Sequence, residues 1–233
     1  GRALAEGLAG AGAEILINGR DTEALGAAAA DLASKGARVK ALAFDVTSED
    51  SVAAAVDHAE REIGPIDILV NNAGMQKRAP IEDFPLDAFE TLMRTNVTSA
   101  FITAKAVARH MIGRGAGRIV NICSINTLLA RPSITPYTAS KGALANLTKG
   151  MATEWGPKGL TVNGLAPGYV RTELTANLVA DAAFSAWLCE RTPLGRWGEV
   201  EDLVGAAVFL CSEASRFVNG HILYVDGGLT ARV

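Results

Sequence analysis

A tyrosine and a lysine stand four places apart in the segment PYTASKGALANLTKG, residues 136–150. On a helix, residues i and i+4 lie one above the other, so Tyr137 and Lys141 can approach within several ångströms. A phenol needs its pKa lowered by about three units, roughly 4 kcal/mol, to act as a base at neutral pH, and a positive charge ~4 Å away supplies about that much. The pair could therefore transfer a proton. Alone, its spacing also fits a tyrosine packed on the core beside a lysine stem, which is the commoner arrangement.

Two further polar residues are candidates for the same site. Ser124 closes an apolar run 13 residues before Tyr137, and Asn96 lies inside an expected long helix, although asparagine is a poor helix former. A serine at a strand end is usually a turn residue. An asparagine within a helix usually faces water. Together with Tyr137 and Lys141, however, the two residues indicate a polar site.

The elements that would position these residues alternate regularly along the chain. We expect strands at 14–19, 39–46, 66–74, 117–124, 161–168 and 221–228, and helices near 2–11, 22–35, 49–62, 86–112, 134–155 and 199–212. Strands without polar alternation are buried on both faces, which predicts an α/β fold with a doubly wound, Rossmann-like parallel sheet. No linker or repeat divides residues 1–233, so we expect one domain. Such sheets bind ligands at the carboxyl ends of their strands.

Composition narrows the class of partner. The formal net charge is −3 and the charged residues are interspersed, which argues against nucleic acid and membrane surfaces and favours a small molecule. Three cysteines and the lack of an 18-residue apolar run favour the reducing cytoplasm. The three histidines lack ligand spacing, so we expect no metal site.

Five motifs in order resemble the short-chain dehydrogenase/reductase family. They are NNAG at 71–74, RTNV around Asn96, Ser124 followed by PYTASK, PGYVRT at 167–172 and YVDGG at 224–228. The resemblance covers the whole chain and implies a hydride-transferring oxidoreductase. It implies that Tyr137 is the general acid/base and that Ser124 hydrogen-bonds the substrate oxygen. Lys141 would hold the nicotinamide ribose and lower the Tyr137 pKa, and Asn96 would support a water in a proton relay.

The same resemblance implies a dinucleotide site along the strand ends. Its backbone and side-chain contacts would come from Asn72, Ala73, Gly74, Asp45, Val46, Pro167, Gly168, Val170 and Thr172, together with Tyr137 and Lys141. The family begins with a strand and a T-G-x-x-x-G-x-G turn that binds the cofactor pyrophosphate. Here Gly1 matches the last glycine of that turn. We therefore expect the first strand and most of the glycine-rich loop to be missing from this chain.

The residues after the second family strand bear on cofactor choice. Family members that prefer NAD usually carry an acidic residue there, whereas this chain has Gly19 followed by Arg20. A guanidinium suits a 2′-phosphate and the missing carboxylate removes repulsion, so we expect NADP(H). Simple solvation of Arg20 is the alternative.

The segments around the motifs resemble family members that interconvert D-gluconate and 5-dehydro-D-gluconate. The implied substrate is a sugar acid, and Arg78 is our first candidate for its carboxylate, ahead of Arg131; Ser124 and Tyr137 would contact the reacting oxygen. A solvated loop arginine is the alternative. A 3-oxoacyl-[acyl-carrier-protein] reductase and a non-catalytic binding relative are the alternative functions.

The family resemblance also implies a homo-oligomer, a tetramer or possibly a dimer. Ala100, Ala104 and Ala108 could let a long helix approach its symmetry mate, or could pack within the chain.

Overall fold

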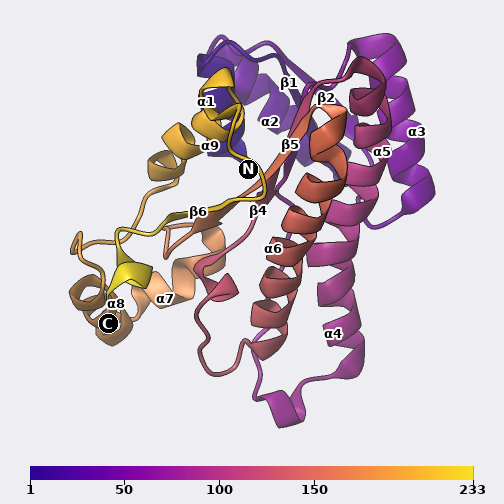
Figure 1. Ribbon diagram of the computed structural model, residues 1–233. Helices are drawn as coiled ribbons and strands as arrows, with labels where there is room; N and C mark the ends of the chain where they lie inside the picture. The colour runs from indigo at the N-terminus through magenta and orange to yellow at the C-terminus, as the bar shows by residue number, and fades with distance from the viewer. Residues whose placement is uncertain (233) are drawn as a thin grey trace.

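The expected apolar runs form six parallel strands, shorter at their ends than expected. The computed structural model describes residues 1–232 (Figure 1). Its strands are β1 Ile15–Gly19, β2 Val39–Ala43, β3 Ile68–Asn71, β4 Gly117–Ile122, β5 Leu160–Pro167 and β6 Ile222–Val225. The α/β class with parallel strands is confirmed, and every strand pair is parallel.

The strands form two sheets rather than the single sheet expected. One sheet has the order β1-β2 and the other the order β3-β4-β5-β6. The pairing of β4 with β5 extends from Gly117 opposite Leu160 to Ile122 opposite Leu165. Both sheets contribute to one hydrophobic cluster, since Ile15 of β1 packs in the same cluster as Val120 of β4. Shared side-chain packing, rather than a continuous backbone ladder, therefore joins the two sheets.

Helices occur at each expected position. The α-helices are α1 Arg2–Gly10, α2 Thr22–Ser34, α3 Glu49–His58, α4 Leu86–Met93, α5 Ser99–Arg114, α6 Thr135–Trp155, α7 Ala176–Ala180, α8 Ala182–Arg191 and α9 Val204–Leu210. Capping explains some of the starts, as the Asp21 carboxylate accepts hydrogen bonds from the first turn of α2 and Ser48 does so for α3.

The core has a cluster on each side of the larger sheet. Residues of α3, α5 and α6 pack with β4 and β5 in one cluster, including Val52, Met111 and Met151. Residues of α1 and α9 pack with β4 and β5 in another, including Leu8 and Leu210. In Figure 1, α5 and α6 lie together on one side and α1 and α9 on the other. This is the layering of a doubly wound fold.

The expected helix 86–112 is interrupted, and two helices were not expected. A π-helical turn, Arg94–Thr98, separates α4 from α5, and it contains the poor helix former Asn96. The unexpected helices α7 and α8 lie near β6, an edge strand of the larger sheet (Figure 1). A signal for α8 was present, because Asp181 precedes it and accepts a hydrogen bond from the Phe184 backbone N–H.

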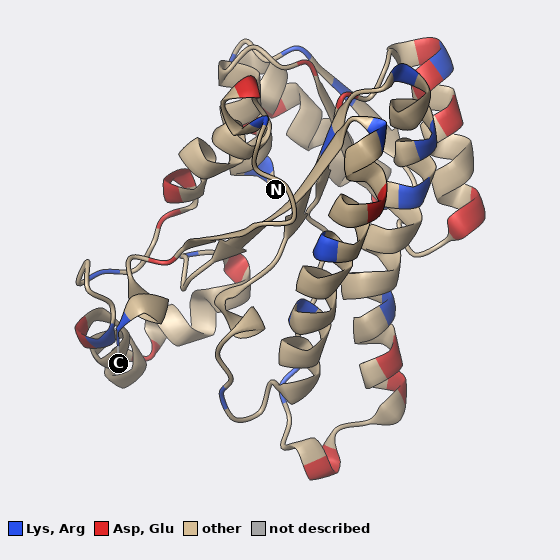
Figure 2. Ribbon diagram, viewed as in Figure 1, with Lys and Arg blue, Asp and Glu red and all other residues tan. Residues whose placement is uncertain are grey.

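The small-residue stripe of α5 packs inside the chain. Ala100, Ala104 and Ala108 are 5%, 0% and 1% exposed. The suggestion that this stripe contacts a symmetry mate is therefore wrong, and the alternative, packing within the chain, is what the structure has. On the surface, α2, α3 and α4 carry Asp and Glu while α5 carries Lys and Arg, so the two signs of charge lie mainly on different helices (Figure 2). Within residues 1–232, no helix has the length and apolarity needed to span a membrane.

Candidate active site

Ser124 and Tyr137 meet at the carboxyl end of β4. The strand ends at Ile122, and Ser124 is buried and begins a short 3₁₀ helix, where its Oγ accepts a hydrogen bond from the Asn126 N–H at 3.1 Å. Tyr137 lies in the first turn of α6, which Pro136 starts with its fixed backbone angle. The Ser124 side chain interacts with the phenol and lowers its pKa. The structure thus brings the two residues together from segments far apart in the sequence.

Lys141 lies one turn further along α6 and points back to the sheet. Its side chain is 5% exposed, and Nζ donates a hydrogen bond to the Ile122 carbonyl at 2.7 Å. Nζ is 5.7 Å from the centroid of the Tyr137 ring. Burial lowers the pKa of Lys141 to about 8, because the charged ammonium is poorly solvated there.

The expected effect of Lys141 on the tyrosine is wrong in this geometry. The pKa of Tyr137 is raised, chiefly because burial disfavours the phenolate, and the contact with Ser124 offsets only part of this. Lys141 is directed at the Ile122 carbonyl, so its charge is already engaged by the backbone. The i, i+4 spacing indicates the attraction of the lysine charge but not the cost of burying a phenolate, which is the larger effect here.

Asn96 joins three segments of the site. Its side chain is 1% exposed and forms hydrogen bonds with both the N–H and the carbonyl of Met75, at 2.7 and 3.0 Å. Its amide also donates to Ser140 Oγ at 3.0 Å, and that hydroxyl donates to the Tyr137 carbonyl at 2.7 Å. The side chain thus fixes the turn after β3 against the start of α6, and its hydrogen bonds go to protein groups. A water held by Asn96 stays a prediction.

The expected dinucleotide residues lie along the same edge. Gly1 lies at the start of α1, where a Cβ would come 2.8 Å from Asn72 Nδ2. The exposed segment of Asn72, Ala73 and Gly74 follows β3, and a Cβ on Gly74 would lie 3.7 Å from Lys141 Nζ. The start of α1, with its unpaired N–H groups, therefore faces the turn after β3.

The turn after β5 is held close to the end of β6. Pro167 ends β5, and the Gly168 N–H donates to the Val225 carbonyl at 2.9 Å. A Cβ on Gly168 would lie 2.7 Å from Asp226 Cα, so this close approach requires glycine. Val170 is buried and pairs with Gly198, and the exposed Thr172 follows.

Arg20 and Asp45 lie near each other at the ends of β1 and β2. The pKa of Asp45 is lowered, mainly because its carboxylate accepts hydrogen bonds from the Thr47 N–H and hydroxyl, both at 2.8 Å, and also because of the Arg20 charge. Val46 follows and is half-buried. Arg20 is exposed, and within residues 1–232 no carboxylate lies within 4.0 Å of its guanidinium.

Arg78 and Arg131 lie on neighbouring loops. The Ala79 N–H donates to the Ser133 carbonyl at 3.1 Å, which ties the loop after β3 to the loop before α6. Burial and the positive charge of Arg131 both lower the pKa of Arg78. The structure therefore brings together the two arginines that the sequence suggested as separate candidates.

A cavity of about 400 Å³ lies next to Ser124 and contains residues that the sequence analysis did not single out. Its lining includes Asn126, Leu129, Arg131, Tyr169, Phe184, Trp187 and Arg191. Of these, Tyr169 follows the PG turn at the end of β5, and Phe184 and Trp187 belong to α8. These aromatic residues were missed because α8 was not expected, and Asp181 was the signal that could have located them.

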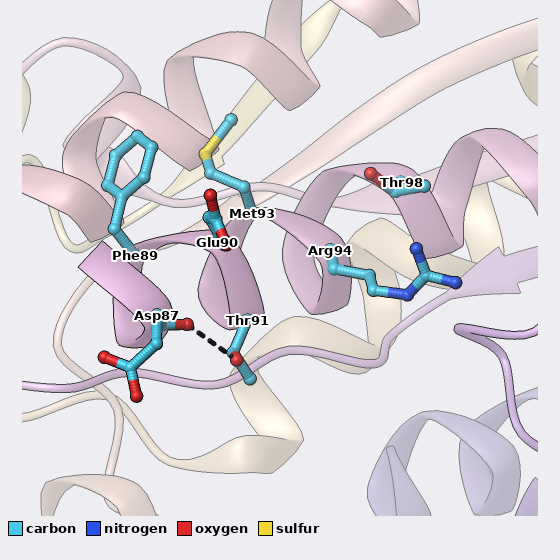
Figure 3. Close-up of a pocket in the computed structure, with 7 residues that line it drawn as sticks. All are labelled: Asp87, Phe89, Glu90, Thr91, Met93, Arg94 and Thr98. Carbon is cyan, nitrogen blue, oxygen red and sulfur yellow. Dashed lines mark hydrogen bonds between the residues drawn. The ribbon is translucent and has the colours of Figure 1, made fainter. Parts of the chain in front are cut away.

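A larger cavity, of about 560 Å³, is lined without Ser124, Tyr137, Lys141 or Asn96. Its lining residues are Asp87, Phe89, Glu90, Thr91, Met93, Arg94 and Thr98, all from α4 and the π-helical turn. Figure 3 shows these side chains spreading to several sides of one helix rather than converging on a point. None of them is a candidate catalytic residue. The smaller cavity is therefore the better candidate for the substrate.

The polar groups at the strand ends fit a phosphorylated dinucleotide. Arg20 offers a cation for a phosphate, the N–H groups at the start of α1 suit an anion, and Lys141 has N–H donors beyond the one bonded to Ile122. Among residues 1–232, no group of three His, Cys, Asp or Glu side chains gathers as a metal site would require.

Comparisons with known proteins agree with this geometry. A family model described as enoyl-(acyl carrier protein) reductase matches residues 1–230. The chain is 59% identical to gluconate 5-dehydrogenase of Gluconobacter oxydans, over 99% of this chain and 90% of that protein. It is 50% identical to 5-keto-D-gluconate 5-reductase of Escherichia coli, over 99% of this chain and 91% of that protein. The crystal structure of a gluconate 5-dehydrogenase from Burkholderia cenocepacia, in complex with NADP and tartrate, matches with a TM-score of 0.97 and 55% identity, over 99% of this chain and 91% of that chain. The chain therefore belongs to the short-chain dehydrogenase/reductase family.

Proposed function

We propose that this protein is an NADP(H)-dependent oxidoreductase that interconverts D-gluconate and 5-dehydro-D-gluconate. The observation that carries the proposal is the meeting of Ser124, Tyr137 and Lys141 at the carboxyl end of β4. Two relatives support it: they are 59% and 50% identical to this chain and are named gluconate 5-dehydrogenase and 5-keto-D-gluconate 5-reductase.

Tyr137 and Ser124 act on the oxygen at C5 of the substrate. In reduction, the Tyr137 hydroxyl donates its proton to this oxygen while the Ser124 hydroxyl donates a hydrogen bond to it. The raised pKa of Tyr137 keeps the phenol protonated at neutral pH, which suits an acid. In oxidation the same group must accept a proton, so gluconate oxidation should accelerate as the pH rises.

The dinucleotide is held along the strand ends. When bound, NADP(H) supplies or accepts the hydride at C5. Lys141 binds the nicotinamide ribose hydroxyls with N–H groups that Ile122 does not use, and Arg20 pairs with the 2′-phosphate. The start of α1 at Gly1 takes the pyrophosphate. The remaining contacts come from Asp45, Val46, Asn72, Ala73, Gly74, Pro167, Gly168, Val170 and Thr172.

The substrate carboxylate is bound at the other end of the site. Arg78 is the first candidate, because its loop follows β3 and lies beside the loop that carries Arg131. A guanidinium can take a carboxylate through two parallel hydrogen bonds, which would hold C5 in position for hydride transfer.

We also propose that the protein works in the cytoplasm as a homotetramer of single-domain chains. This part rests on the family resemblance and the cysteine content. Sedimentation equilibrium would measure the assembly, and a monomeric mass at micromolar concentration would contradict it.

Steady-state assays with defined substrates test the function. Wild-type protein is given D-gluconate with NADP⁺, and 5-dehydro-D-gluconate with NADPH, alongside related aldonates and a 3-oxoacyl thioester. We expect the highest kcat/KM for the gluconate pair. Higher kcat/KM for the thioester would favour an acyl-carrier-protein reductase, and binding of NADPH without turnover of any substrate would favour a non-catalytic relative.

A further inference from the structure

Arg131 is held by aromatic side chains in the cavity beside Ser124. Its guanidinium carbon lies 4.8 Å from the centroid of the Phe184 ring, and its Nη1 donates to the Tyr169 hydroxyl at 3.3 Å. The rings are themselves fixed: Tyr169 packs edge-on against Phe184 and Trp197, with centroids 5.4 and 5.9 Å apart. A planar guanidinium stacked on an aromatic ring loses little side-chain freedom when it binds an anion.

The positive charges of Arg78 and Arg131 have no acidic partner within the described chain. Among residues 1–232, neither Arg78 nor Arg131 has a carboxylate within 4.0 Å. The two side chains repel each other enough for the Arg131 charge to lower the pKa of Arg78. Like charges held together without a counterion favour binding of an anion, because the anion relieves their repulsion.

Arg131 lines a cavity beside the reacting groups. Arg131 and Tyr169 line the same cavity as Asn126, two residues after Ser124. The hydrogen bond from Ala79 to Ser133 fixes the loop of Arg78 beside this cavity.

We propose that Arg131 binds the carboxylate of the substrate jointly with Arg78, and that Phe184 of α8 is the positioning residue that holds the Arg131 guanidinium in place for this contact. This inference rests on the proposed function and assigns its substrate specificity. The inference also assigns a role to α8, because Phe184 belongs to this helix. Binding of the substrate carboxylate would then depend on the packing of α8 beside the cavity.

The test compares a charged substrate with an uncharged one. The two substrates are 5-dehydro-D-gluconate and L-sorbose, a ketohexose with a CH₂OH group in place of the carboxylate, supplied at high concentration. For Arg131→Met we expect kcat/KM for the acid to fall about tenfold to hundredfold, mainly through KM, as one charged hydrogen-bonding partner is lost. On L-sorbose the change should stay within about threefold. Arg131→Lys, which keeps the charge but not the planar stack, should recover only part of the loss.

Phe184 is tested through its dependence on Arg131. Phe184→Leu should raise KM for the acid about threefold to tenfold in the wild-type background and have little further effect in Arg131→Met, since a positioning residue acts through its partner. A purely structural role for Phe184 would affect both substrates and both backgrounds alike. Thermal unfolding of each variant checks that the fold is kept.

Arg171 provides the matched control. Its guanidinium also lies over an aromatic ring, 5.8 Å from the Trp197 centroid, but it already forms a salt bridge with Glu199 at 3.1 Å. Arg171→Met should change the rates on both substrates by the same factor. Equal losses on the two substrates in Arg131→Met, or an acid-selective loss in Arg171→Met instead, would overturn the inference. Failure of wild-type protein to reduce 5-dehydro-D-gluconate would instead refute the proposed function itself.

Discussion

Replacing Lys141 by methionine should make the protein more stable at neutral pH, although it removes a group proposed for catalysis. Burial lowers the pKa of Lys141 from its ordinary value of 10.5 to about 8. That difference corresponds to about 3 kcal/mol of destabilisation of the folded state whenever the lysine is charged. Methionine has a similar length and no charge to desolvate.

The expected gain is smaller than this, because the Ile122 carbonyl would lose its partner. Nζ donates to that oxygen at 2.7 Å, and leaving a buried acceptor unpaired costs about 1 kcal/mol. The net gain in the free energy of unfolding is therefore about 2 kcal/mol, which for a chain of this length raises Tm by about 4–8 °C. Lys149→Met, an exposed lysine on the same helix, is the control and should change stability by less than ~0.5 kcal/mol.

The gain in stability from Lys141→Met should fall as the pH rises. Between pH 8 and 10.5 the unfolded chain keeps the lysine proton that the folded chain releases, so the stability of wild-type protein at this site rises with pH. The advantage of Lys141→Met is thus full below pH 8 and shrinks above it. It vanishes at pH ~10, where the remaining charge effect only equals the loss of the hydrogen bond to Ile122, and it reverses at higher pH. Urea unfolding without nucleotide, from pH 6 to 10, measures this. A Lys141→Met protein that is no more stable than wild type at pH 7, or whose advantage is independent of pH, would refute the reasoning.

Three further predictions concern cofactor choice, substrate binding and the framework of the site. Gly19→Asp combined with Arg20→Ser should shift preference towards NAD(H) by about tenfold to hundredfold, since one phosphate ion pair is lost and a repelling carboxylate gained; steady-state kcat/KM with both cofactors checks this, and a wild-type preference for NAD(H) would contradict it. Arg78→Ala should lower kcat/KM for 5-dehydro-D-gluconate by about a hundredfold and for L-sorbose far less, and equal losses would show that it does not bind the acid. Asn96→Ala should reduce the free energy of unfolding by about 2–4 kcal/mol in urea titrations, because the Met75 backbone loses a buried partner; an unchanged midpoint would contradict this.

The sheet strands were predictable because their signal is local. In the run 117–124, the consecutive apolar residues Ile119 and Val120 point to opposite faces of the sheet and are both buried, and such a run predicts burial on both faces directly. The number of sheets was not predictable, since it depends on which strands hydrogen-bond across distant segments. The break of the 86–112 helix at Arg94–Thr98 had only the presence of Asn96 as a signal.

The site was predictable in its residues but not in its energetics. Motif spacing identified Ser124, Tyr137 and Lys141, and the fold brings them to one strand end. The sign of the Tyr137 pKa change was wrong, because burial of the phenol is a tertiary property that i, i+4 spacing does not reveal. The same holds for Phe184, which contacts Arg131 across 53 positions of sequence.

Single-turnover hydride transfer by Tyr137→Phe tests the central claim most directly. This variant keeps the ring, the helix and Lys141 and removes only the phenolic hydroxyl. With saturating NADPH and 5-dehydro-D-gluconate, the rate of NADPH oxidation should fall by about two to four orders of magnitude. The Kd for NADPH should stay within about threefold of the wild-type value, since the hydroxyl is assigned to proton transfer rather than to holding the nucleotide. Hydride transfer at the wild-type rate would contradict the assignment of Tyr137 as the proton donor.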